Sequence, residues 1–437
     1  MLKQCQMNIP NCNLRKLVQL EAQASRQYFP HYSTFFMIYL SLNFNIFMTS
    51  DFFTTKHGNE IKIIPEYFNA HNINSANDVL EGDTIYFKKK HSLNELFTGF
   101  FKDFYKYSVV LDFLKSNGLE THWDATLDIG GQEGYVSRFL HGEGRANTAD
   151  CVEIKNYENV LDNKKMNWMY NRYKIWRICK KIGLDYKSKI SKVTKALDGI
   201  SASFGYYPSS NSSFYNLKFT EKPEISNYII GDVLKLNKKY DFISSILSLE
   251  YFDHRVLFKK VSELLNEHGV FVFLVNYWWF PVNSTRLVGN FPYACQRLEK
   301  DDFIKYLKQF HATDVEDSLK TYDYFGGGIE QKPTLTQYIQ DAEKNDLQLI
   351  SSYRFIPVSK NHTKTPLAPT SLDNLSDFTF DEVLKDIHHF RSDVSLEDLK
   401  TAFVMAIFIK KDKPKDNLDS KIKQLTIDGY GSYQKRV

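Results

Sequence analysis

The chain has 437 residues, which is too many for one domain of average size and fits either one large domain with additions or two ordinary domains. Hydrophobic residues make up 43% of it and aromatic residues 15%, so a large core is expected and a disordered chain is excluded. The 56 basic and 52 acidic side chains nearly balance, and this balance gives no indication of a DNA-binding protein.

The first 50 residues are poor in acidic side chains and contain the apolar stretch FFMIYLSLNFNIFM, from Phe35 to Met48. A membrane-spanning helix needs roughly 20 apolar residues, whereas this stretch is shorter and includes two asparagines, so we expect no stable membrane insertion. Residues 1–50 are interpreted as a targeting segment for an organelle or as an extraneous extension. The cysteines are scattered without a Cys-x-x-Cys pair, which favours a reducing, cytoplasmic location and gives no indication of a metal site.

Residues 51–119 are expected to form a mostly helical N-terminal region. Its last part, YKYSVVLDFLKSNG, carries Val109, Phe113 and Leu114 at helical spacing, and Gly118 offers an end to this helix. At the other end of the chain, residues 411–437 are polar and show no apolar periodicity, so we expect a tail outside the domain.

Residues 120–410 alternate short apolar runs with helical patterns. Runs of this length, rich in Val, Ile and Phe, are typical of strands that are buried on both faces of a mostly parallel sheet. In chain order the runs are ATLDIG, CVEI, NYIIGD, YDFISSIL, GVFVFLV, LQLISSYRFI and TAFVMAIFI. The pattern predicts an α/β domain on a doubly wound, mostly parallel, seven-stranded sheet.

Two segments exceed what such a domain needs, namely residues 155–225 and 283–330. The first begins with a helical pattern that places six residues on one face, with basic residues opposite. We expect this helix to pack on the domain, and a lid over the substrate is the alternative. The six residues are Trp168, Arg172, Ile175, Trp176, Cys179 and Ile182.

The string TLDIGGQEGYVSRFL combines the end of a strand, a glycine-rich turn and the start of an amphipathic helix. Gly130, Gly131 and Gly134 let the backbone approach a ligand closely, and the first turn of the helix offers free amide donors. Asp128 places an acid at the end of the strand, beside the turn. The turn is therefore a candidate cofactor site.

This string resembles the first motif of the class I S-adenosylmethionine-dependent methyltransferases, in which an acid is followed by glycines at alternating positions. Gln132 departs from the motif because it stands where the family usually has its middle glycine. A dinucleotide-binding turn is the competing interpretation, but Glu133 would set a carboxylate beside the diphosphate and repel it. The resemblance implies S-adenosylmethionine as the cofactor.

Further positions agree with the same family. Glu153, at the end of the next strand, matches the acid that holds the two ribose hydroxyls, since a carboxylate can accept from both. Asp232 resembles the residue that accepts from the adenine amino group, and Val233 would supply the neighbouring backbone donor. With the turn and Gln132, Ser248 at the end of the fourth strand completes the expected cofactor site.

Acceptors bind in such folds at the carboxyl ends of the fourth and fifth strands, where the strand order reverses. His254 is a candidate general base there, or a helix-capping residue, and Glu250 could orient an acceptor hydroxyl or amine. Two adjacent Trp side chains at the end of a strand cannot both point into one core, so at least one should line the crevice. The expected substrate-binding residues are Tyr251, Tyr277, Trp278 and Trp279.

The chain lacks both the (Asp/Asn)-Pro-Pro-(Tyr/Phe) motif at the fourth strand and a Pro-Cys nucleophile. These absences favour a methyltransferase that modifies O, N or S of a small molecule. An RNA or protein methyltransferase that uses the basic, aromatic segment 155–225 is one alternative, and a non-catalytic S-adenosylmethionine-binding subunit is another. A nicotinamide-dependent enzyme is the least favoured interpretation.

Overall fold

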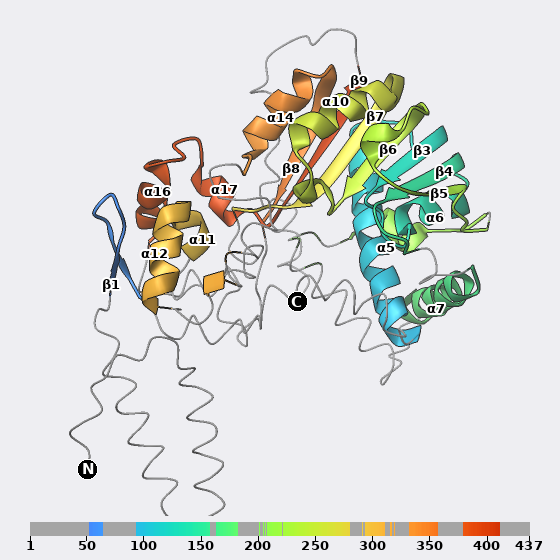
Figure 1. Ribbon diagram of the computed structural model, residues 1–437. Coiled ribbons are helices and arrows are strands. Elements are labelled where there is room, and N and C mark those ends of the chain that lie inside the picture. Colours follow the sequence, from blue (N-terminus) through green and yellow to red (C-terminus); the bar gives the residue numbers. More distant parts are fainter. Residues whose placement is uncertain are drawn as a thin grey trace, which may run out of the picture. The chain divides into compact units, whose positions relative to one another are not determined.

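The computed structural model divides the chain into two units, which are residues 1–54 with 60–63, and residues 55–59 with 64–437 (Figure 1). The expected extension at 1–50, the tail at 411–437 and most of the segment 283–330 lie outside the described residues. No helix within the described ranges is long and apolar enough to cross a membrane. The structure describes residues 52–63, 93–157, 163–181, 201, 204, 206, 208–220, 222–279, 291, 293–310, 315, 316, 319, 332–356 and 379–410.

The first unit contains a short antiparallel pair, β1 (Phe52–Thr54) and β2 (Glu60–Lys62). Phe53 pairs with Ile61, and both side chains are buried. This pair lies at the start of the region that the sequence predicts to be mostly helical. The helix predicted at the end of that region is present as α5 (Leu93–Ser116), and Gly118 follows it with a φ of 71°.

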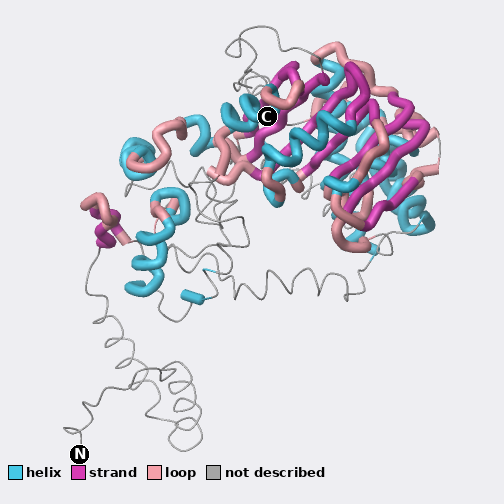
Figure 2. The backbone as a smooth tube through the Cα atoms, turned by 45° about the horizontal axis from the view of Figure 1, so that its top comes forward, coloured by secondary structure: helices cyan, strands magenta, loops and turns pink. Residues whose placement is uncertain are grey.

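The second unit is built on one seven-stranded sheet with the strand order β5-β4-β3-β6-β7-β9-β8 (Figures 1 and 2). Neighbouring strands are parallel from β5 to β7, and only β9 runs antiparallel to its two neighbours. The bounds are β3 (Trp123–Ile129), β4 (Ala146–Glu153), β5 (Asn227–Ile230), β6 (Tyr240–Ile246), β7 (Leu265–Asn276), β8 (Leu347–Phe355) and β9 (Phe403–Lys410). This arrangement confirms the predicted doubly wound, mostly parallel sheet and is that of the class I methyltransferase fold.

The order of the strands reverses between β3 and β6. From β3 the chain proceeds to β4 and β5 on one side, and from β6 it proceeds to β7 on the other side. The connections after β3 and β6 therefore leave in opposite directions and open a crevice at the carboxyl ends of these two strands. This edge is where a ligand site is expected.

Helices cover both faces of the sheet because its strands are apolar on both faces. In β7 the alternating residues Phe271 and Phe273 belong to one core cluster, whereas Val272 and Leu274 belong to the other. The first cluster includes residues of α10 (His254–Leu264) and α14 (Leu335–Glu343). The second includes α5, α6 (Tyr135–Gly142), α7 (Asn163–Lys181) and α9 (Ser213–Asn216).

The remaining described helices are two 3₁₀-helices, which follow β5 and β6, and four α-helices that lie between β7 and β9 in the sequence. Each of α16 and α17 begins with a capping box, in which the N-cap Thr or Ser side chain accepts from the backbone amide three residues on, and the side chain of that residue accepts from the N-cap amide. The bounds are η3 (Val233–Lys235), η4 (Leu249–Tyr251), α11 (Ala294–Arg297), α12 (Lys300–Phe310), α16 (Phe380–His388) and α17 (Leu396–Lys400).

The helix predicted at the start of the segment 155–225 is α7, and it packs on the domain, through a face that overlaps only in part with the one expected. Ile175, which the sequence placed on the packed face, is 58% exposed, as is Ile178 at 57%. Tyr173 lies at the centre of the buried side, and its ring packs at 5.1 Å from that of Phe104 on α5. Trp176 and Cys179 of the expected face are buried, whereas methionines and tyrosines, which the pattern did not count, fill the rest of the contact. The buried residues of α7 are Met166, Met169, Tyr170, Tyr173, Trp176 and Cys179.

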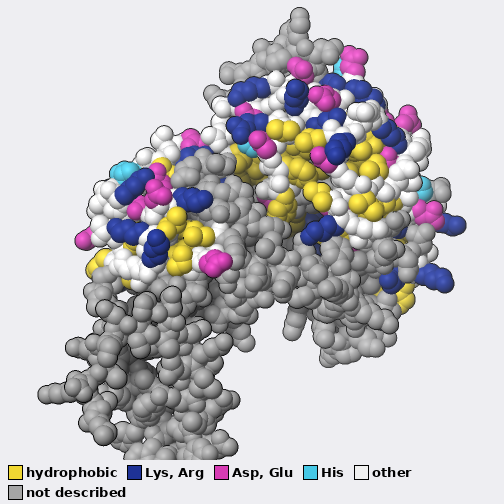
Figure 3. All heavy atoms as spheres, in the orientation of Figure 1, with side chains coloured by type: hydrophobic (Ala, Val, Ile, Leu, Met, Phe, Trp, Pro, Cys, Tyr) yellow, Lys and Arg dark blue, Asp and Glu magenta, His cyan; other side chains and the backbone are white. Residues whose placement is uncertain are grey.

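Charged side chains of both signs are mixed on the surface. On the face drawn in Figure 3, Lys and Arg side chains lie next to Asp and Glu side chains, with apolar side chains between them. This mixture reflects the near balance of the composition.

Candidate functional site

The residues that the sequence assigns to a cofactor lie after the carboxyl ends of adjacent parallel strands. The glycine-rich turn follows β3, Glu153 ends β4 and Asp232 follows β5. The register pairs Ile129 with Val152 and Glu153 with Ile230, so the three strands end at the same edge of the sheet. These residues are thus brought together at the edge where the strand order reverses.

The turn after β3 has no room for side chains at its glycines. Gly130 has a φ of 68°, and a Cβ on it would lie 2.4 Å from the Cβ of Ser248. A Cβ on Gly131 would lie 2.3 Å from Oδ2 of Asp128. Both positions therefore require glycine, because Ser248 and Asp128 occupy the space that a side chain would need. The outer surface of the turn is then bare backbone.

Gln132 adopts a left-handed conformation with a φ of 48°, which explains why glycine is usual at this position in the family. Its backbone is held on both sides. The amide donates to Oε2 of Glu153 at 3.1 Å, and the carbonyl accepts from the hydroxyl of Tyr228 at 2.6 Å. The departure from the motif is therefore accommodated without loss of the turn.

Asp128 is a buried carboxylate beneath this turn. Its Oδ1 accepts from Oγ of Ser244 at 2.7 Å, whereas its Oδ2 has no hydrogen-bond partner among the described residues. Burial raises the pKa of Asp128 to about 7, the charges of Glu153 and Asp103 add to this, and the Ser244 hydrogen bond opposes it. A cationic group above the turn would stabilise the ionised form.

Glu153 joins the end of β4 to the turn. Its Oε1 accepts from the backbone amide of Ile154 at 2.8 Å, and its Oε2 accepts from Gln132. Burial raises the pKa of Glu153, and these backbone amides oppose the rise. Each oxygen retains capacity for a further donor, as the expected role at two hydroxyls requires.

Asp232 is exposed and caps the short helix η3, where its Oδ1 accepts from the amide of Leu234 at 2.9 Å. Val233 differs from Asp232 because its side chain is buried in the core. Two apolar residues that sequence reasoning missed lie beside these acids, namely Ile154, which is 69% exposed, and Leu234, which is 40% exposed. An apolar residue directly after a strand-end acid is the signal that could have identified Ile154.

Ser248 does not present its hydroxyl to the outside of the turn, as a cofactor contact would require. Its Oγ donates to the carbonyl of Ile129 at 2.6 Å and shares a hydrogen bond with Ser245 at 2.7 Å. The side chain is buried directly under Gly130. Ser248 therefore supports the turn from within the protein.

Glu250 lies in η4, after β6, on the acceptor side of the edge. Its Oε1 accepts from Nδ2 of Asn276 at 2.7 Å, and its Oε2 is buried without a hydrogen-bond partner among the described residues. Burial raises the pKa of Glu250 to about 7, against the hydrogen bonds and the positive charge of Lys106. A carboxyl group with this pKa can exchange a proton near neutral pH, which is a property of a general base.

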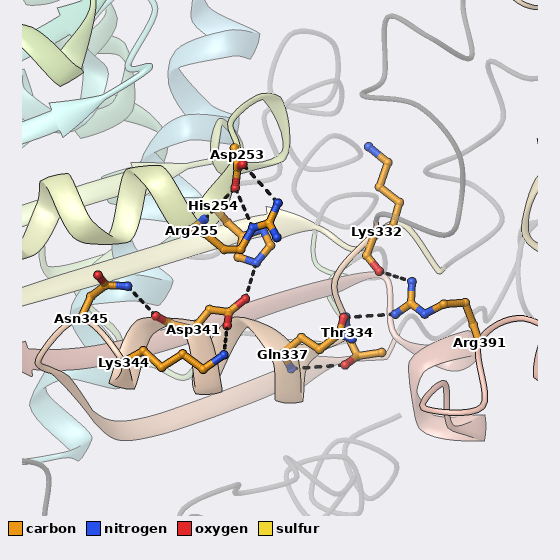
Figure 4. A network of polar contacts seen from close by, with 10 residues as sticks. All are labelled: Asp253, His254, Arg255, Lys332, Thr334, Gln337, Asp341, Lys344, Asn345 and Arg391. Carbon is orange, nitrogen blue, oxygen red and sulfur yellow. Dashed lines mark hydrogen bonds and ion pairs between the residues drawn. The ribbon is translucent and has the colours of Figure 1, made fainter.

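His254 is turned toward α14 rather than standing free in a crevice (Figure 4). Its Nε2 lies 3.0 Å from Oδ2 of Asp341, and its ring packs at 5.0 Å from that of Tyr338. Burial lowers the pKa of His254, and the bond to Asp341 opposes this. The N-cap of α10 is Asp253, not His254. These contacts give His254 a role in joining α10 to α14.

The four aromatic candidates divide into two kinds. Tyr277 is buried, and its hydroxyl donates to Asp398 at 2.5 Å and accepts from the amide of Leu335 at 2.8 Å. Trp279 is also fully buried. Trp278 is half-buried and Tyr251 is 56% exposed, so only these two offer surface to a substrate. The expectation that the adjacent tryptophans differ in direction agrees with the structure.

A surface depression occurs at the opposite edge of the sheet, at the amino ends of the strands. It is lined in part by Trp123, Arg145 and His268. None of the candidate cofactor, catalytic or substrate residues lines it. In the described parts of the chain, no three His, Cys, Asp or Glu side chains converge in a way that could hold a metal ion.

No model of a known protein family matches the sequence, and no curated protein is significantly similar to it. Solved structures do match. Geranyl diphosphate C-methyltransferase from Streptomyces coelicolor A3(2) is 13% identical, and the match covers 70% of this chain and 79% of that chain with a TM-score of 0.33. An S-adenosylmethionine-dependent methyltransferase from Mesorhizobium loti is 14% identical, and the match covers 68% of this chain and 96% of that chain with a TM-score of 0.31. These values are low, and it is the strand order of the chain itself that identifies the fold.

Proposed function

We propose that this protein is an S-adenosylmethionine-dependent methyltransferase that transfers a methyl group to O, N or S of a small-molecule acceptor. The observation that carries the proposal is the buried carboxylate of Asp128 beneath a turn whose glycines admit no side chain, at the edge where the strand order reverses. A carboxylate in this place favours a cationic ligand and disfavours a diphosphate.

The residues at this edge of the sheet have the charges, hydrogen-bond acceptors and apolar side chains that S-adenosylmethionine would need. Asp128 would act through its charge, because Gly131 stands between its Oδ2 and the outer surface of the turn. Glu153 would accept from two neighbouring hydroxyls, and Asp232 would accept from an amino group. The exposed side chains of Ile154 and Leu234 would cover an apolar ring system.

The cofactor would supply an electrophilic methyl group, and the chain would supply alignment and a proton acceptor. Glu250 would take the proton of an acceptor hydroxyl or amine through Oε2, a buried oxygen that has no hydrogen-bond partner among the described residues. Asn276 would hold the other oxygen of the carboxylate in place. Trp278 would form an apolar wall that excludes water beside the acceptor.

The proposal is tested by calorimetric titration of the purified protein with S-adenosylhomocysteine and, separately, with NAD. We expect binding of the first ligand alone. Glu153→Gln should weaken it at least tenfold, because an amide keeps the acceptor for the backbone but cannot accept with both atoms. Asp124→Asn at the opposite edge is the matched control and should leave the affinity unchanged. Binding of neither ligand, or an unchanged affinity in Glu153→Gln, would contradict the proposal.

A further inference from the structure

The helix α7 concentrates positive charge in a chain whose charges are otherwise nearly balanced. Its sequence contains seven basic residues and no acidic residue. Over residues 155–200 the sequence has 12 basic and 4 acidic residues, whereas the complete chain has a net charge of only +4. The remainder of the chain is therefore net negative, and this segment is the part of the sequence that a polyanion would attract.

One side of α7 is fixed against the domain. The hydroxyl of Tyr173 donates to the backbone carbonyl of Phe214. The ring of Trp176 packs edge-on at 4.9 Å from that of Phe101 on α5, and Figure 1 shows the two helices side by side. Because these contacts set the rotation of α7 about its own axis, they also decide which of its residues face outward.

The outward face of α7 combines apolar and basic side chains. Ile175 and Ile178 are both more than half exposed and lie one helical turn apart. Lys164 and Lys174 are exposed on the same face, since their helical spacing places them within the same arc as the isoleucines. The other exposed residues of this face are Asn167 and Asn171. The face therefore presents an apolar pair beside positive charge.

Two basic side chains of α7 contact uncharged groups. Nζ of Lys174 lies 4.3 Å from the ring centroid of Tyr170. Nη1 of Arg177 donates to the backbone carbonyl of Leu217 at 2.8 Å. Neither contact cancels the positive charge of the side chain, so both charges contribute to the attraction of an anionic surface.

An anionic lipid bilayer fits this face better than RNA or a protein does. Single-stranded RNA stacks its bases on exposed rings, but Tyr173 and Trp176 are buried, and the guanidinium of Arg172 lies over the ring of Trp168 at 4.4 Å. A stable protein interface takes about 20–30 residues from each side, which is more than this helix face contains. A bilayer needs no such complementary surface, because its head groups attract lysines and its acyl chains accept isoleucines.

We propose that α7 docks the protein on a membrane surface rich in anionic lipids. Ile175 and Ile178 enter the boundary between head groups and acyl chains, and Lys164 and Lys174 lie at the level of the lipid phosphates. The helix lies in the plane of the membrane and does not span it. This docking is independent of the proposed function, since none of these residues belongs to the candidate cofactor or acceptor site.

The test measures binding of the full-length protein to sedimented vesicles of phosphatidylcholine, with and without about one third of phosphatidylserine, at physiological salt. The anionic vesicles should bind at least roughly tenfold more tightly than the neutral ones. Lys164→Gln/Lys174→Gln should weaken this binding roughly tenfold or more, because each lysine near an anionic surface contributes about a factor of five. Ile175→Ser/Ile178→Ser should weaken it by a similar factor, because the apolar contribution is lost.

Val256→Ser/Lys259→Gln is the matched control, because it removes an exposed apolar and an exposed basic side chain from α10. This variant should bind the anionic vesicles as the wild type does. All the exchanged side chains are exposed, so the thermal unfolding temperature of each variant should match that of the wild type.

Equal binding to neutral and anionic vesicles would overturn the inference, and so would unchanged binding of either α7 variant. A single-stranded oligouridine is the probe for RNA. If the wild type binds this oligonucleotide but not the anionic vesicles, the basic face belongs to an RNA site and the membrane docking is refuted.

Discussion

Replacing Asp128 by asparagine is expected to stabilise the folded protein at neutral pH. The side chain is only 2% exposed, and its burial raises the pKa from the ordinary 3.8 to about 7. The folded state therefore binds a proton that the unfolded state has released, so the wild type loses stability as the pH rises from about 4 to about 7. Asparagine carries no charge, can still accept from Ser244, and does not lose stability in this way.

The magnitude follows from the difference between the two pKa values. A difference of roughly 3 pKa units, at about 1.4 kcal/mol per unit, means that ionised Asp128 lowers the stability of the folded wild type by at most about 4 kcal/mol at pH 8. At pH 5 the same two pKa values give a destabilisation of about 2 kcal/mol, because the carboxyl group is protonated in the folded state but mostly ionised in the unfolded state. The stability of Asp128→Asn relative to the wild type should thus increase by about 2 kcal/mol between pH 5 and pH 8.

Urea unfolding followed by circular dichroism at several pH values measures this difference. Asp124→Asn is the matched control, since Asp124 is an exposed aspartate at the amino end of the same strand, and its effect should not grow with pH in this way. Titration with S-adenosylhomocysteine should show weaker binding to Asp128→Asn. A stability difference that is constant from pH 5 to pH 8 would refute the argument from burial.

Three further results are expected. Gly130→Ala should cost about 3 kcal/mol or more by thermal unfolding, whereas Gly118→Ala, which has a similar φ and open space around it, should cost about 1 kcal/mol; equal losses would contradict the clash beneath the turn. His254→Gln should lower stability by about 1 kcal/mol, through loss of the contact with Asp341, and leave the transfer rate unchanged. Because burial lowers the pKa of His254, the wild type should lose this contribution as the pH falls below about 6.5. Glu250→Gln should lower the rate about 100-fold without changing cofactor affinity, and the wild-type rate should fall below about pH 7; an unaltered pH profile in the variant would exclude Glu250 as the base.

Much of the fold was accessible from the sequence because the strands are apolar on both faces and glycines mark the turns between them. The glycine-rich turn could be identified from residues 128–134 alone, since close packing and left-handed backbone angles require glycine there. The packed face of α7 could not be identified in the same way. Several residue types at helical spacing can fill one contact, and the aromatic side chains of α5 select among them.

In the candidate site, the sequence likewise predicts the positions of residues along the chain but not the contacts of single side chains. The sequence placed Ser248 and Tyr277 at the ends of strands, which is correct, but it could not give the direction of their hydroxyl groups. Ser248 bonds to the carbonyl of Ile129, and Tyr277 bonds to Asp398, which is far away in the sequence. Partners of this kind become neighbours only when the sheet is assembled.

The sequence by itself determined the seven strands, the turn after the first of them and the acids at the ends of the next two, because each depends on residues that are close together in the chain. The tertiary structure alone decided that Glu250 is buried against Asn276 and that His254 joins Asp341. The raised pKa of Glu250 has the same origin. Burial and charge depend on groups that distant segments bring together, and no local pattern records them.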